Sequence, residues 1–123
     1  MGNFKDLKVW NRAHALTIDI YRVSSIFPKS ELFGLTQQIR RAVVSIESNL
    51  AEGCGRRTDK ELARFALISN GSTNELQCQL SIARDLGYLD RDSFARLQCE
   101  FGEISSMLSG LVTRMRSRET IFD

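Results

Sequence analysis

The sequence predicts an all-α protein that folds as one domain, an antiparallel up-down-up-down four-helix bundle. Four segments carry apolar residues at helical spacing, and turn or capping residues separate them. The 123-residue chain has a single proline and is 42% hydrophobic, enough to bury a core without disulfide or metal support. The expected helices span residues 6–27, 31–52, 59–87 and 91–116, and their short links favour antiparallel packing.

The first helix is expected to start at Asp6, whose carboxylate can cap the first turn, and to end near Phe27. Pro28 stops it, because proline biases the preceding residue away from helical geometry. Ser30 then stands where it can cap the second helix.

The second helix has one apolar face and one polar face, and we expect it to end at Gly53, a residue type that adopts the left-handed turn without steric cost. Its apolar face consists of Leu35, Ile39, Ala42, Val43, Ile46 and Leu50.

Thr58 and Glu61 form a capping-box pattern that predicts the start of the third helix. Inside that helix, Gly71-Ser72 suggests a close approach of a neighbouring backbone. Asp90 or Asp92 is expected to cap the fourth helix. A close helix approach is also the one role we assign to Gly102 and Gly110.

Bulk properties narrow the class of protein. No apolar run approaches the about 20 residues of a membrane span, and the amino-terminal residues lack the pattern of a secretory signal, so we expect a cytoplasmic protein. Three widely spaced cysteines argue against a disulfide framework. The net charge of +2 is unevenly distributed. Residues 1–57 carry nine basic and five acidic side chains, whereas residues 58–123 carry eight basic and ten acidic side chains.

The basic residues are the candidate site for an anion or a nucleic acid. The turn from Gly53 to Thr58 combines flexible backbone, two arginines and a helix start, yet it lacks the P-loop pattern, and a C-terminal glycine followed by solvated arginines is the alternative. The candidate positive surface consists of Arg40, Arg41, Arg56, Arg57, Lys60 and Arg64.

Polar residues of the second helix form a candidate subunit interface. Ser45, Asn49 and Glu52 share one strip, which would serve as an intersubunit hydrogen-bond seam or a small-molecule site. An ion pair of Arg40 or Arg41 with Glu75, or with a neighbouring subunit, is the structural alternative to nucleic-acid contact.

Nothing in the sequence predicts catalysis, a cofactor or a metal site. His14 is the single histidine, and no cysteine or carboxylate stands at nucleophile or metal-ligand spacing from it, so we interpret it as structural.

Three separated motifs carry a resemblance to a known family: Phe4 to Trp10, Phe33 to Arg57, and Gly71 to Leu76. Together they resemble the four-helix bundle proteins of 23S ribosomal RNA intervening sequences. The resemblance implies a small bacterial homopentamer. It also implies a relation to the accessory proteins of diversity-generating retroelements, which engage a reverse transcriptase and its RNA.

Two hypotheses for function follow. In the first, an oligomeric bundle associates with RNA or a nucleoprotein through its basic surface. In the second, the bundle is a protein-interaction scaffold without a nucleic-acid role. The net acidic second hairpin weighs against the first, because a surface devoted to RNA is basic over much of its area.

Overall fold

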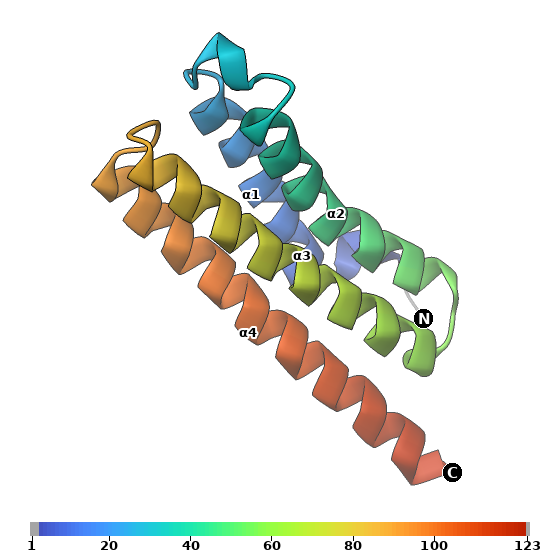
Figure 1. The fold of residues 1–123 in the computed structure, drawn as a ribbon. Coiled ribbons are helices and arrows are strands. Elements are labelled where there is room, and N and C mark those ends of the chain that lie inside the picture. The colour runs from blue at the N-terminus through green and yellow to red at the C-terminus, as the bar shows by residue number, and fades with distance from the viewer. Residues whose placement is uncertain (1–2, 123) are drawn as a thin grey trace.

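The computed structural model describes the backbone of residues 3–122 and the side chains of residues 3–118. Within this part of the chain all regular structure is helical (Figure 1), which confirms the predicted fold class. The four long helices are α1 (Lys8–Ser24), α2 (Leu35–Gly55), α3 (Asp59–Asp85) and α4 (Arg91–Phe122). Two short 3-10 helices, η1 (Phe4–Asp6) and η2 (Lys29–Glu31), precede α1 and α2.

Contacts between neighbouring helices show that they run antiparallel. Ser45 on α2 hydrogen bonds to Ser72 on α3, while the carbonyl of Ile46, one residue further along α2, accepts from Ser69, earlier on α3. Residue numbers therefore rise along one helix as they fall along the next. Contacts between the other neighbouring helices show the same reversal. They are Thr17–Val43 and Ser24–Arg40 between α1 and α2. Between α3 and α4 they are Asn70–Ser105 and Arg84–Phe94, and between α1 and α4 they are Arg12–Glu103 and Asp19–Arg96.

The core lies between the four helices and is built from the apolar face of each. All six residues of the predicted apolar face of α2 contribute to it, with Leu35 at its edge. The largest side chains with almost no exposure are Leu16, Ile20, Ile39, Ile46, Leu50, Leu76, Leu80, Leu97, Ile104, Leu108 and Leu111.

The predicted start of the first helix is wrong. Asp6 lies in η1, which Asn3 caps, and Leu7 precedes α1 without any side-chain cap. The helix also ends at Ser24, before the predicted Phe27, and the Ser25 hydroxyl donates to the Arg22 carbonyl in its last turn.

The start of the second helix differs for a related reason. Ser30 belongs to η2 and does not cap α2, which starts at Leu35 behind Gly34. Here the Glu31 side chain accepts from the Leu35 amide at 3.4 Å. Leu32 and Phe33 consequently lie in the link and outside the helix.

Gly53 does not end α2, which continues to Gly55. Gly53 is buried, and a Cβ placed on it would lie 2.8 Å from the Phe65 Cβ of α3. Its small size therefore serves close packing of the α2 and α3 backbones. The left-handed backbone of this turn belongs instead to Arg57, at φ 65°.

The caps of both later helices are confirmed, except that the Glu61 carboxylate pairs with Arg64 and does not complete the capping box. The Thr58 hydroxyl accepts from the Glu61 amide at 3.1 Å, and the Asp90 carboxylate accepts from the Ser93 amide at 2.7 Å. The close approaches predicted at three other glycines are wrong: a Cβ at Gly71 or Gly102 would meet nothing within 4 Å, and one at Gly110 only a terminal guanidinium nitrogen at 3.6 Å.

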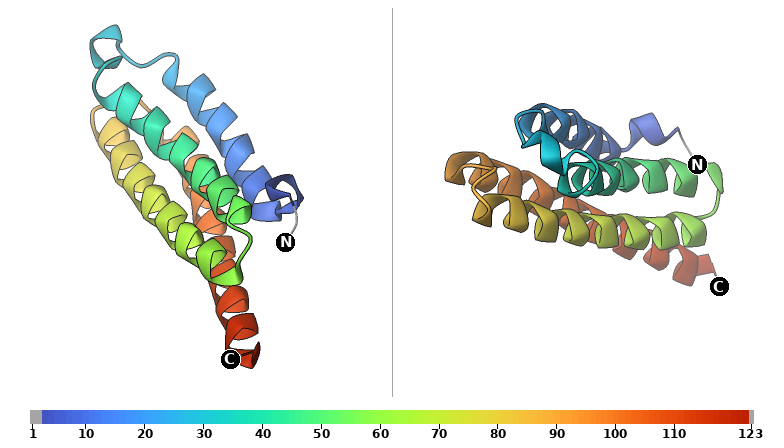
Figure 2. Two further views of the ribbon diagram at one scale, coloured as in Figure 1. Left: turned by 90° about the vertical axis from the view of Figure 1, so that its right-hand side faces the viewer. Right: turned by 45° about the horizontal axis from the view of Figure 1, so that its top comes forward.

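α4 is longer than predicted, since it continues to Phe122. Figure 2 shows its carboxyl-terminal end extending past the other three helices. The end of the bundle that holds the α2–α3 turn is therefore flanked by the last turns of α4.

Candidate functional site

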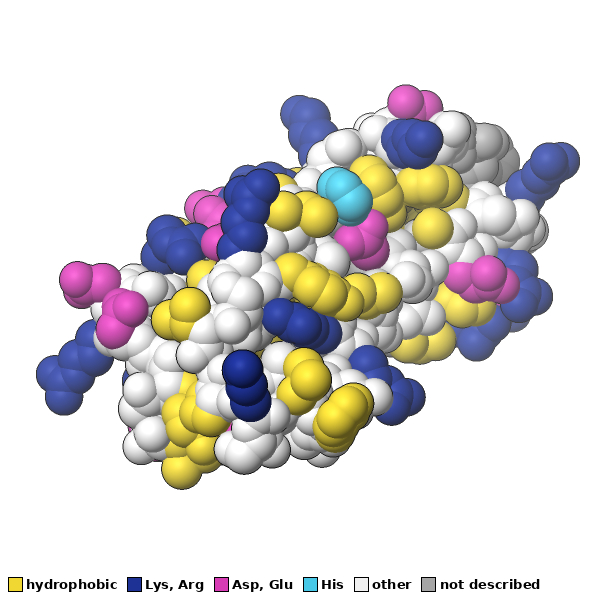
Figure 3. All heavy atoms as spheres, turned by 90° about the horizontal axis from the view of Figure 1, so that it is seen from above, with side chains coloured by type: hydrophobic (Ala, Val, Ile, Leu, Met, Phe, Trp, Pro, Cys, Tyr) yellow, Lys and Arg dark blue, Asp and Glu magenta, His cyan; other side chains and the backbone are white. Residues whose placement is uncertain are grey.

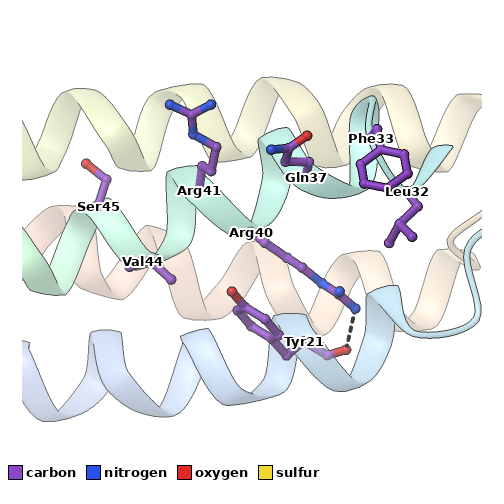
Figure 4. Close-up of a pocket in the computed structure, with 8 residues that line it drawn as sticks. All are labelled: Tyr21, Leu32, Phe33, Gln37, Arg40, Arg41, Val44 and Ser45. Carbon is purple, nitrogen blue, oxygen red and sulfur yellow. Dashed lines mark hydrogen bonds between the residues drawn. The ribbon is translucent and has the colours of Figure 1, made fainter.

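A largely apolar groove lies on the outer side of α1 and α2, with a volume of about 570 Å³. The link before α2 closes one end of it (Figure 4). Its walls are Tyr21, Leu32, Phe33, Gln37, Arg40, Arg41, Val44 and Ser45.

Large apolar side chains in and around this groove are open to solvent. Phe33 is 86% exposed, and Tyr21 and Leu32 are nearly half exposed. Large exposed hydrophobic residues lie on α1, α2, α3 and the first link, and none lies on α4 among residues 91–118. Figure 3 shows hydrophobic side chains beside basic ones on one such face. An apolar surface of this kind is typical of a docking site.

The two adjacent arginines of α2 point in different directions, as their 100° separation on the helix predicts. Arg40 reaches across to α1, where it donates to the Ser24 hydroxyl at 2.9 Å and the Tyr21 carbonyl at 3.3 Å, and its guanidinium lies over the Tyr21 ring. Arg41 points in the opposite direction (Figure 4). Its side chain has no hydrogen bond or ion pair within the described chain, and Glu75 accepts only from the Gln79 amide at 3.1 Å.

The predicted polar strip lies beside the groove, along the seam between α2 and α3. Asn49 donates to the Ser45 carbonyl and hydroxyl, and Ser45 in turn contacts Ser72 at 2.8 Å. Glu52 pairs with Arg56 one turn further on. These residues thus tie α2 to α3 and to itself, and their part in a subunit interface stays a prediction.

A second basic cluster surrounds the α2–α3 turn. Arg64 pairs with Glu61 at 2.7 Å, and this ion pair lowers the pKa of the Glu61 carboxyl. The guanidinium groups of Arg56 and Arg64 both lie over the Phe65 ring. Lys60 is exposed. Neighbouring carboxylates therefore partly neutralise this turn.

The structure does not join the six predicted basic residues into one surface. Arg40 and Arg41 lie at the groove, whereas the other four gather at the far end of α2. Fifteen residues of helix separate Arg41 from Arg56, a distance of about 22 Å at 1.5 Å per residue. The chain therefore carries two basic clusters.

His14 contacts a carboxylate that its sequence spacing did not indicate, and its structural role stays a prediction. Its Nδ1 lies 2.9 Å from a Glu47 carboxylate oxygen on α2, and its ring stacks on Trp10 at 4.9 Å. Among the described residues no cluster of histidine, cysteine or acidic side chains has the arrangement of a metal site. Nor does any described helix combine the length and apolarity needed to cross a bilayer.

Sequence reasoning missed Leu32 and Phe33, the most exposed walls of the groove. We placed both inside the second helix, where burial would follow from periodicity. The available signal was Gly34, which follows them and interrupts the helical pattern just before Leu35.

The fold and the groove define a small helical-bundle protein with exposed apolar side chains in a surface groove. Residues 5–110 match the family described as 23S rRNA-intervening sequence protein, and the chain belongs to this family. The match confirms the resemblance carried by the three motifs. No curated protein matches the chain.

Proposed function

We propose that this protein is a non-catalytic, self-assembling binding module and that the groove of α1 and α2 is a contact between copies of the chain. The resemblance described above favours a homopentamer. The observation that carries the proposal is the exposure of Phe33 beside Tyr21 and Leu32 in a formed groove. Burying one such side chain contributes about 1.5–3 kcal/mol.

Charge complementarity favours a second copy as the occupant. Arg41 lies one turn before Ser45 on α2, and Glu75 lies one turn after Ser72 on α3. Because Ser45 and Ser72 are in contact, both charged residues lie on the face that α2 and α3 share. Within one chain Arg41 and Glu75 do not pair. In a ring of identical subunits one neighbour brings a carboxylate to Arg41 and the other neighbour brings a guanidinium to Glu75, so the same two residues pair at every contact between subunits.

A charge-reversal cycle tests this contact. Arg41→Glu and Glu75→Arg are each expected to lower the assembled mass toward that of the 14.0 kDa chain, because each places like charges opposite one another. The double variant restores the pair in the reverse sense and is expected to recover the assembled mass. Sedimentation equilibrium of all forms provides the measurement.

Arg91→Glu is the matched control, because it makes the same charge change at an exposed position at the start of α4. It is expected to leave the mass unchanged. A wild-type chain that sediments as a monomer at all concentrations would overturn the proposal. Assembly that survives both single variants would exclude the Arg41–Glu75 pair.

Binding of RNA is the second candidate function, and it is favoured by unpaired arginines at the opposite end of the bundle from the groove. We expect either function to operate in the cytoplasm, because the three cysteines are all free thiols, as is usual in a reducing compartment.

A further inference from the structure

A cleft at the end of the bundle collects three arginines from segments far apart in the sequence. Arg57, from the α2–α3 turn, and Arg114 and Arg118, from the last turns of α4, all line it, and its volume is about 500 Å³. Among residues 3–118, whose side chains the structure describes, Asp59 is the only acidic residue in its walls, and it pairs with Arg118 at 3.2 Å. The described walls of the cleft therefore carry a charge of +2.

The two remaining guanidinium groups have no anionic partner among the side chains that the structure describes. The side chains of Arg57 and Arg114 form no hydrogen bond or ion pair within the described residues, although other arginines at this end do. Two cations that share a cleft without a counter-charge repel each other, and an anion between them removes that cost. Guanidinium groups match the geometry of phosphate oxygens in particular.

The backbone of Arg57 adds an independent argument. Its φ of 65° lies in the left-handed region, a conformation that glycine adopts without steric cost. The chain thus holds an arginine in a conformation that disfavours any residue with a Cβ. Such strain is typical of functional positions.

The floor of the cleft is apolar, formed by Leu62, Leu111 and Met115 with Leu7 at one side. A small inorganic anion would contact only the arginines. A nucleotide unit offers both a phosphate for the arginines and an apolar base or ribose face for the floor.

We propose that this cleft is a phosphate-binding site in which Arg57 and Arg114 hold the phosphate group of a nucleotide, Arg118 being positioned beside it by Asp59. The ligand is either the backbone of a single-stranded RNA or a small phosphorylated molecule, since both present the same group. The site is about one bundle length from the groove and does not depend on self-assembly.

The test uses the full chain and a fluorescein-labelled single-stranded RNA of mixed sequence, with anisotropy measured over a salt series. Arg57→Ala/Arg114→Ala is expected to weaken binding at least about tenfold. It is also expected to reduce the slope of log affinity against log salt by about 0.7, the value for one phosphate of a single strand that is no longer neutralised. Arg22→Ala/Arg91→Ala removes the same charge from exposed positions elsewhere and is expected to change affinity less than twofold.

A second arm measures the melting temperature in sodium phosphate against sodium chloride of equal ionic strength. A rise that is lost in Arg57→Ala/Arg114→Ala, without RNA binding, would identify a small phosphorylated ligand. Arg57→Gly removes the cation and relieves the backbone strain, so this variant is expected to melt no lower than wild type while losing the phosphate effect.

Three results would overturn the proposal: equal losses in the cleft and control variants, retention of the phosphate effect by Arg57→Gly, or the absence of both RNA binding and phosphate stabilisation. The assembled mass of each variant is recorded in the same buffers, so a failure of phosphate binding can be distinguished from a failure of self-assembly.

Discussion

At the scale of single residues, Gly53 shows how one missing methyl group fixes the distance between two helices. It lies in the interior of α2, where glycine costs about 1 kcal/mol relative to alanine. A larger residue would not fit, because a Cβ at this position would lie 2.8 Å from the Phe65 Cβ and 3.3 Å from the Leu62 Cα. The close packing of α2 and α3 requires glycine at this position.

Gly53→Ala is therefore expected to destabilise the fold, by about 1–3 kcal/mol, because overpacking against backbone outweighs the gain in helix propensity. Urea denaturation followed by circular dichroism measures the effect. Gly71→Ala is the matched control: it adds the same methyl group to a helix interior with nothing within 4 Å, and it is expected to stabilise by up to about 1 kcal/mol. Effects of the same sign in both variants would contradict this account of Gly53.

At the scale of elements, the helix boundaries depend on side-chain caps that compete with local turns. Thr58 and Asp90 cap α3 and α4 where the sequence places them, because each stands directly before the helix and three residues before the amide that it accepts. Asp6 and Ser30 have the same chemistry, yet 3-10 turns occupy their positions.

The Asp90 cap gives a pH dependence that can be measured. Hydrogen bonds from the Ser93 amide and hydroxyl lower the pKa of Asp90 below its ordinary value of 3.8. The cap therefore contributes its full stabilisation above that value and loses it as pH falls through the lower folded-state pKa.

Asp90→Asn tests this dependence, because asparagine caps helices without titrating. Below pH 4 the difference in unfolding free energy between wild type and variant is expected to shift in favour of the variant. Urea midpoints from pH 7 to pH 3 provide the comparison. Parallel midpoints over the whole range would show that Asp90 does not contribute to acid sensitivity.

Some features of the candidate sites can be predicted from the local sequence pattern, and others arise only from the packing of the helices. Periodicity identifies the buried face of α2, and the cluster of arginines near Gly55 is visible in the sequence. The sequence does not contain the pairing of Arg40 with Ser24 on α1, nor the meeting of Arg57 with Arg114 in one cleft. Both contacts join segments that only the folded bundle brings together.

At the scale of the whole molecule, the apolar groove and the arginine cleft lie at different places. The groove lies beside the start of α2, and the cleft lies beyond its end. One end of the molecule thus offers a surface for another protein chain and the other a site for an anion, so both can be occupied at once.

Self-assembly predicts that stability depends on protein concentration. Association through folded surfaces adds a free energy that grows with concentration, so the melting temperature of wild type is expected to rise over a hundredfold concentration range. Arg41→Glu is expected to remove most of that rise. A melting temperature independent of concentration in wild type, measured by scanning calorimetry, would be inconsistent with an assembled fold.

The contacts of Trp10 give the molecule an intrinsic optical probe. Trp10 is the single tryptophan, and it packs between Phe4, at 4.8 Å, and His14 near the start of α1. Leu7, which lines the arginine cleft, lies one turn away, whereas Tyr21 in the groove is about 16 Å further along the helix. Its emission spectrum should consequently respond when the cleft is filled and remain constant when copies associate through the groove, so one unlabelled sample distinguishes the two events.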